Sequence, residues 1–345
     1  MRGSVTRVEI AALLAVAQDH CFGQPPGSQL RATVLGQELA SAAGADPTEL
    51  AITWWTAALR FLGCTGHAFE VAVLFGDEIE LRARSLELDS ASPVDVLRLI
   101  VGHAGPGSSG ARRALAVVSA VAGGRRDVEF NFRTACEVGD VLATRLGLDE
   151  RVRSALASDF ERWNGRGLPI GRKGLEIPWP MRIAQLAQEL EVLARAAGID
   201  RAIDVVLGRR GRAYDPDLVD LVVSDAAGWW VEVESADPWD AALAAAPPSS
   251  PLGEAATHES MLVLADFADL KSPWRIGHSR GVAALVTEAG GLVAEEAALV
   301  HDLGLVAVPN SIWDEPAPLT RDERDQAESH TLITDQLLCR LPYTA

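Results

Sequence analysis

The stretch "ALVHDLGLVAVPNSIWDEP", residues 298–316, places His301 and Asp302 side by side where an apolar helical run ends in a glycine turn. Imidazole and carboxylate groups are both good ligands for first-row divalent metals. One interpretation is therefore a metal centre, to which other helices add ligands. The alternative is an ordinary helix end, where the imidazole caps backbone carbonyls and the carboxylate is solvated. Spacing alone leaves both open.

The composition limits the functional classes. The chain has 345 residues, of which 48% are apolar, and a formal net charge of −17. This length favours two domains, and so acidic a protein binds nucleic acids and anionic membranes poorly, because both are polyanions. Four cysteines without a CxxC pair suit a reducing cytosol. We find no signal peptide and no apolar run long enough for a membrane span, so we expect a cytoplasmic protein.

The periodicity of apolar residues predicts an all-α fold. The predicted helices cover 6–19, 29–43, 48–62, 91–102, 111–122, 131–146, 149–162, 180–197, 199–208, 258–268, 278–290, 294–302 and 320–341. The best strand signal is WWVEVE at 229–234, and the most linker-like segment is ALAAAPPSSPLGEA at 242–255. We therefore expect a helical domain at 1–223, a connector at 224–258 and a second helical part at 259–345. The tryptophans are expected to anchor the core.

Three histidines gather in the second part, and each is predicted at a different helix position. His278 opens a helix, His301 closes the next together with Asp302, and His330 lies within the last long helix. Imidazoles and a carboxylate from separate helices would suit Mn, Fe or Zn.

The segment from His278 to His330 resembles the HD-GYP branch of the HD-domain phosphohydrolases. The resemblance rests on "GHSRGVA" (277–283), "AALVHDLG" (297–304), "VAVPNSIWDEPAPLT" (306–320) and "RDERDQAESHTLI" (321–333). It implies that His278, His301, Asp302 and His330 bind divalent metal, with Asp302 as a bridging carboxylate and His301 and Asp302 at the catalytic centre. It also implies a phosphodiester substrate, such as cyclic di-GMP or another nucleotide.

Two departures from the family pattern matter for activity. Leu305 stands where the family usually has a lysine that holds a substrate phosphate. The chain also stops at Ala345, before the histidine pair, the Gly-Tyr-Pro loop and the last metal aspartate of the family would follow.

Residues 1–223 resemble an entire HD-GYP domain whose metal ligands have been lost. "SDFERWNGRGLPIGRKGLEIPWPMRIAQLAQELEVL" (158–193) and "AYDPDLVDLVV" (213–223) match the glycines, prolines and apolar residues of the family's second half. The matched ligand positions carry other residues: Gln29 for the first histidine, Arg60-Phe61 for the HD pair, Asp159-Phe160 for the two histidines, Leu168 for the tyrosine and Gln188 for the last aspartate. Such side chains are poor metal ligands, so we expect no metal chemistry there.

Two further features have a plain and a functional interpretation. The only basic cluster that the sequence suggests comprises Arg166, Arg172, Lys173 and Arg182, which could bind a phosphorylated small molecule or a cyclic dinucleotide, or serve only solubility. The pair Asp77-Glu78 is expected to be a solvated turn.

Two functions remain open from the sequence. The first is an HD-type metal-dependent phosphodiesterase whose activity depends on completion of its metal site, by further chain or by a partner subunit such as a second copy in a homodimer. The second is an inactive HD-fold regulatory or scaffold protein that binds a metal or ligand, or acts through dimerisation. A closed site with four ligands can hold an ion without being a catalyst.

Overall fold

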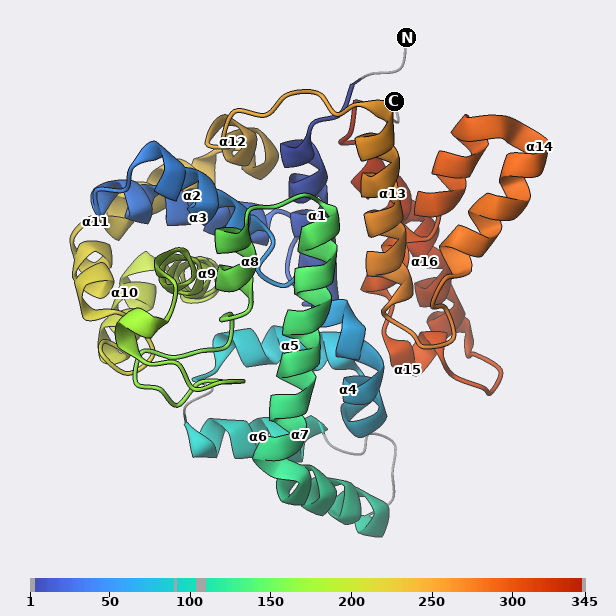
Figure 1. Ribbon diagram of the computed structural model, residues 1–345. Coiled ribbons are helices and arrows are strands. Elements are labelled where there is room, and N and C mark those ends of the chain that lie inside the picture. Colours follow the sequence, from blue (N-terminus) through green and yellow to red (C-terminus); the bar gives the residue numbers. More distant parts are fainter. Residues whose placement is uncertain (1–3, 90–91, 104–109, 343–345) are drawn as a thin grey trace.

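The computed structural model describes residues 4–89, 92–103 and 110–342, and these residues form an all-helical protein (Figure 1). The prediction of an all-α fold is confirmed. Within the described ranges β-type pairing is limited to three isolated bridges. None of the helices there has the length and the apolar composition that a bilayer span requires.

The first part of the chain contains the larger set of helices. They are α1 (Arg7–Cys21), α2 (Ser28–Ala42), α3 (Pro47–Ala58), η1 (Cys64–His67), α4 (Ala68–Phe75), α5 (Glu78–Glu87), α6 (Pro93–His103), α7 (Gly110–Arg145), α8 (Glu150–Leu156), η2 (Gly174–Glu176), α9 (Trp179–Ala197), α10 (Ile199–Gly208) and α11 (Pro216–Ser235). The second part contains α12 (Pro238–Ala244), α13 (Glu254–Asp269), α14 (His278–Val300), η3 (Leu303–Ala307), α15 (Asn310–Trp313) and α16 (Arg321–Leu338).

The predicted strand at 229–234 is wrong, because these residues belong to α11. Trp230 and Val233 are buried, whereas Val231 between them is 67% exposed. Burial at a spacing of three residues follows the period of a helix and not the alternation of a strand. The expected domain boundaries at 223/224 and 258/259 also fall inside helices, α11 and α13, so the irregular connection is confined to the segment between α12 and α13.

Helix α1 joins the two parts of the molecule. Its Ile10, Leu13 and Leu14 are fully buried and belong to one hydrophobic cluster with Phe267 of α13 and Leu303 of η3. In the sequence, the capping box of Thr6 and Glu9 fixes the start of this helix. The second part therefore shares its core with the first: α13 and η3 pack on the first helix of the chain.

Helix α14 folds back on itself, which brings its two ends together (Figure 1). A straight helix of its length would separate the ends by about 34 Å at 1.5 Å per residue. Instead, the ring centroids of His278 at its start and His301 just after its end lie 5.6 Å apart. The two histidines are thus neighbours because of this reversal.

A local hydrogen-bond pattern occurs once in each part of the chain. Asp19 accepts hydrogen bonds from the backbone N–H groups of Gly27 and Gln29, and Asp269 accepts one from the N–H of Ser279. Gly27 and Gly277, which precede α2 and α14, both have left-handed backbone (φ 92° and 80°) that favours glycine. In this match Ser28, and not Gln29, takes the place of His278. The expected correspondence of Gln29 with His278 stays a prediction, and these hydrogen bonds favour Ser28.

A second recurring feature places a glycine against a long helix. A Cβ on Gly304 would lie 2.1 Å from the carbonyl oxygen of His330, and one on Gly63 would lie 1.8 Å from that of Ala135. Gly304 follows shortly after His301-Asp302, and Gly63 follows at the same spacing after Arg60-Phe61, which the sequence analysis matched to that pair. Ala135 in α7 and His330 in α16 thus have the same position relative to these two glycines.

The expectation of a solvated Asp77-Glu78 turn is wrong for Glu78, which is fully buried. Its carboxylate forms an ion pair with Lys271, whose side chain is 7% exposed. Lys271 Nζ also donates to Asn310 Oδ1 over 2.8 Å, and the N–H of Asn310 donates to Glu78. A charge is tolerated in a core only when it is paired and hydrogen-bonded. No local sequence pattern marks this partner, because Lys271 is 193 residues away.

We predict that Gly304→Ala destabilises the protein by about 3 kcal/mol, because η3 and α16 must move apart to admit the methyl group. Chemical denaturation would measure the loss. The matched control is Gly281→Ala in α14, where an added Cβ meets no atom within 4 Å. A Gly304→Ala protein as stable as this control would contradict the close packing of η3 on α16.

Lys271→Met is expected to lower the free energy of unfolding by about 3 kcal/mol, because it leaves the carboxylate of Glu78 buried without its ion-pair partner. The double variant Glu78→Leu/Lys271→Met should recover part of that loss, since both charges are then gone. Arg133→Met, which breaks the exposed Arg133–Glu129 pair, should cost less than about 0.5 kcal/mol. Equal effects of Lys271→Met and Arg133→Met would argue against a structural role for the buried pair.

Candidate metal centre

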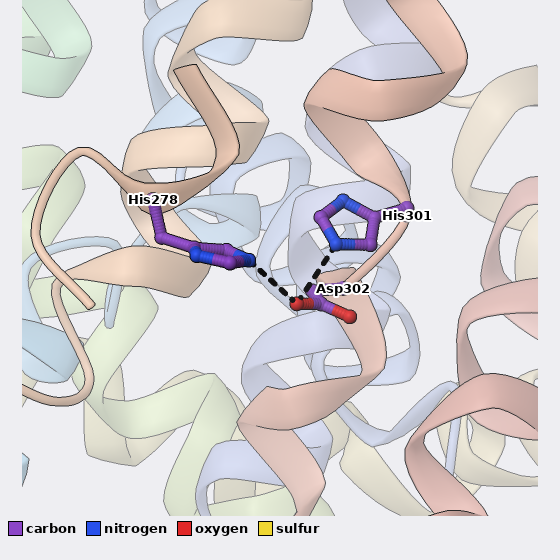
Figure 2. Close-up of side chains that lie close together, drawn as sticks. All are labelled: His278, His301 and Asp302. Carbon is purple, nitrogen blue, oxygen red and sulfur yellow. Dashed lines mark ion pairs between the residues drawn. The ribbon is translucent and has the colours of Figure 1, made fainter. Parts of the chain in front are cut away.

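Four side chains predicted as ligands meet around the carboxylate of Asp302. His278 is the first residue of α14, His301 and Asp302 follow its last residue, and His330 comes from α16. Asp302 Oδ2 lies 3.0 Å from Nε2 of His301 and 3.6 Å from Nε2 of His278, and its Oδ1 lies 3.5 Å from Nε2 of His330. Figure 2 shows His278 and His301 pointing at the carboxylate from opposite ends of α14.

The donor atoms of His278, His301 and Asp302 are close enough to one another to share a divalent ion, and Nε2 of His330 lies against the other oxygen of the same carboxylate. Nitrogen and oxygen ligands lie about 2.0–2.2 Å from zinc, so two donors on one tetrahedral ion are about 3.3–3.6 Å apart. The three distances to Asp302 are close to that range. One donor atom each from His278, His301 and Asp302 also lie within 4.8 Å of one another.

The orientation of two imidazole rings is fixed by hydrogen bonds of their Nδ1 atoms to backbone carbonyl oxygens. Nδ1 of His301 lies 2.7 Å from the carbonyl oxygen of Ala298, and Nδ1 of His330 lies 2.6 Å from that of Ala327. A carbonyl can only accept, so both Nδ1 atoms carry the proton and both Nε2 atoms face Asp302. Metal-binding histidines are held in this way by their second nitrogen. Each Nε2 can then either carry a proton toward Asp302 or bind a cation.

The charges around Asp302 favour its ionised form. Burial by itself raises the pKa of Asp302, but the hydrogen bond from His301 and the charges of His301, Arg275 and His330 outweigh it and lower the pKa overall. The hydrogen bond to Asp302 raises the pKa of His301, against the smaller opposing effect of burial. The carboxylate side chain is 10% exposed, whereas those of His278 and His301 are 39% and 37% exposed. An anion thus lies at the base of a solvent-accessible ring of imidazoles.

Arg275 is a member of this group that the sequence did not suggest. It lies on the loop before α14, and its guanidinium forms an ion pair with Asp302 Oδ2. The same guanidinium lies 5.2 Å from the ring centroid of Trp313, which in turn contacts His330 edge-on. An arginine in an irregular loop has no periodicity that would mark it as a site residue, so only the fold reveals it.

The predicted basic cluster does not share a common acceptor. Arg182 is engaged in an ion pair with Asp215, and Arg172 donates to Ser158 Oγ over 2.8 Å. Arg166 and Lys173 are exposed. A phosphate role for these four residues therefore stays a prediction.

The corresponding place in the first part is filled by other interactions. Arg60 forms an ion pair with the buried Asp159, and Phe61 stacks on Phe22 with ring centroids 4.1 Å apart. Burial raises the pKa of Asp159, in spite of the opposing charge of Arg60. The cavity between these residues and α7 has a volume of about 10 Å³, no more than one water molecule needs.

We predict that divalent metal binding at Asp302 releases protons, and that metal affinity falls by at least tenfold between about pH 8 and about pH 5.5. Lowering the pH through the raised pKa of His301 protonates the nitrogen that must bind the ion. Calorimetric titration with Mn²⁺ in buffers of different ionisation enthalpy would measure the proton release. His258→Asn in α13, outside the ring, should leave it unchanged.

In the metal-free protein, the ion pair of His301 with Asp302 should make the free energy of unfolding depend on pH. The ion pair stabilises the fold between the lowered pKa of Asp302 and the raised pKa of His301. Its contribution is lost as the pH falls through the former or rises through the latter.

In the Mn²⁺ titration, metal binding without any proton release would contradict the assignment of His301 as a ligand.

Comparison with known proteins finds a similar curated protein and a similar solved structure. No family model matches the chain. Among curated proteins, it is 28% identical over 346 residues to 3'3'-cGAMP-specific phosphodiesterase 3 of Vibrio cholerae, an alignment that covers 96% of this chain and 75% of the relative. Among solved structures, it resembles the cyclic GMP-AMP-specific phosphodiesterase V-cGAP3 of V. cholerae with a TM-score of 0.71 and 26% identity, over 98% of this chain and 80% of the other. The chain is therefore similar, along nearly its whole length, to a cyclic dinucleotide phosphodiesterase, and this similarity supports the HD phosphohydrolase family.

Proposed function

We propose that the chain is an HD-type, metal-dependent phosphodiesterase that hydrolyses a cyclic dinucleotide. The proposal depends above all on one observation: the Nε2 atoms of His278, His301 and His330 surround the buried carboxylate of Asp302. Such an arrangement of one carboxylate and three imidazoles suits Mn, Fe or Zn. The similarity to a cyclic dinucleotide phosphodiesterase supports the same activity.

The residues of the chain have distinct parts in this proposal. His278, His301, Asp302 and His330 would hold the ion, which supplies Lewis acidity and lowers the pKa of bound water. The carbonyl oxygens of Ala298 and Ala327 keep two of the imidazoles in the tautomer that can bind it. Asp302 and His301 stay the proposed catalytic pair, because Nε2 of His301 lies nearer to the carboxylate of Asp302 than Nε2 of His278 or His330 does.

The substrate class follows from the charge of the protein and from its relative. A net charge of −17 disfavours long polyanions such as nucleic acids. A small phosphodiester avoids most of that repulsion and can be held by a few local cations. The curated relative is named as specific for 3'3'-cGAMP, and we propose the same class of substrate for this chain.

We also propose that the first part is a degenerate copy of the HD-GYP unit with a structural role. The recurring contacts of Asp19 and Asp269 and the recurring approaches of Gly63 and Gly304 support this relation. The ion pair of Arg60 with Asp159 and the stacked Phe61 occupy the region of its former ligands. On this proposal the copy keeps the fold and holds α13 and η3 in place.

A metal-binding protein without turnover is the second candidate. The observation that favours it is Leu305, which is 3% exposed and takes the place where the resembling family has a phosphate-binding lysine. With that lysine absent, the site could bind an ion as a regulatory or structural element.

Asp302→Asn should reduce bound metal and reduce hydrolysis of 3'3'-cGAMP by at least about hundredfold, because it removes the anion at the base of the ring. Metal content after purification and product formation with added Mn²⁺ are the two measurements, with cyclic di-GMP and bis(p-nitrophenyl) phosphate as further substrates. The matched control is Asp335→Asn, an exposed aspartate on the same helix as His330. Bound metal without turnover of any of the three substrates would support the second candidate, and a metal-free wild-type protein would exclude both.

A further inference from the structure

Arg275 and a divalent ion compete for the same oxygen of Asp302. The guanidinium forms its ion pair with Oδ2, and this is also the oxygen that His301 and His278 approach. An ion bound to these nitrogens would need Oδ2 at about 2.0–2.2 Å. A guanidinium in contact with that oxygen would occupy the space and repel the ion, so one cation must leave when the other arrives.

The hydrogen bonds of Arg275 suggest which acceptor its guanidinium would take after it leaves Asp302. Its Nε is buried and has no hydrogen-bond partner in the structure. A guanidinium presents its N–H groups in a fixed fork that matches the oxygens of a phosphate. Arg275 contacts Asp302 through a terminal nitrogen, so only part of this fork is used and Nε is left without an acceptor.

The surroundings of Arg275 keep its charge at the centre when it leaves Asp302. The guanidinium lies over the indole of Trp313, a contact that stabilises a cation without fixing it to one acceptor. The loop that carries Arg275 is anchored by Lys271, which pairs with Glu78, and by Ser272 Oγ, which donates to Asp314 over 2.6 Å. Leu305 leaves the centre without the family's lysine, so a phosphate needs a cation from another element.

We propose that Arg275 binds Asp302 in the metal-free protein and transfers to a phosphate of the substrate when a divalent ion takes its place. This inference rests on the proposed function, because it assumes the metal centre. Arg275 then has two acceptors in succession, first Asp302 and then a phosphate of the substrate. The ion then recruits the substrate in two ways: it binds the phosphate itself, and it releases the guanidinium that holds it.

The test uses the full chain and the variants Arg275→Met and Arg275→Lys, with Arg321→Met, an exposed arginine at the start of α16, as the control. Calorimetric titration with Mn²⁺ should show an affinity at least tenfold higher in Arg275→Met, because the competing cation is gone. In the Mn²⁺-loaded proteins, the affinity for inorganic phosphate should be at least tenfold lower in Arg275→Met, because a charged hydrogen-bond donor is missing. Arg275→Lys should fall between, and Arg321→Met should match the wild type.

The outcomes separate this inference from the proposed function. If wild type and Arg275→Met bind Mn²⁺ equally well, the competition is refuted while the metal centre stands. If Arg275→Met gains metal affinity but binds phosphate as the wild type does, the transfer to phosphate is refuted. If none of the proteins binds Mn²⁺, both the proposed function and the role of Arg275 are wrong.

Discussion

The buried carboxylate of Asp302 is the charge on which the arrangement of the second part depends. An isolated anion in this position would be costly, so the fold surrounds it with three imidazoles and one guanidinium. These groups come from the loop before α14, both ends of α14 and the middle of α16. The reversal of α14 and the glycine contact between η3 and α16 both bring these groups close to the carboxylate.

The two parts of the chain share several backbone contacts, but the side chains enclosed by these contacts differ. In each, an aspartate accepts backbone hydrogen bonds ahead of a glycine that begins a helix, and a second glycine lets a long helix approach closely. Around Asp302 the enclosed groups are polar and face one carboxylate. Around Phe61 they are an aromatic stack and a single ion pair. Backbone geometry is preserved in both, because it depends on glycine and apolar residues and not on the identity of the ligands.

The sequence predicted the elements whose signals are local and missed those that depend on distant partners. Helix periodicity and the capping residues predicted an all-helical chain, and the spacing of His278, His301, Asp302 and His330 selected side chains that do converge. Arg275 and Glu78 were missed because their partners, Asp302 and Lys271, are remote in sequence or lie across an irregular loop. The hydrogen bonds of Asp19 and Asp269 favour Ser28 over Gln29 as the counterpart of His278, a difference of one residue in register that the sequence pattern did not reveal. Whether the four ligands hold an ion is a question of affinity that spacing cannot answer.

The pairing of Glu78 with Lys271 has a consequence for how the chain matures. During synthesis Glu78 leaves the ribosome long before Lys271, since 193 residues separate them. Until then its carboxylate must stay hydrated, and the apolar face of α1 lacks the neighbours that α13 and η3 later provide. Contacts so far apart in sequence form late and slowly. The contacts of Glu78 and of the apolar face of α1 are therefore completed only when the C-terminal helices have emerged, whereas the cluster between α2, α9, α10 and α11 contains residues of the first part alone.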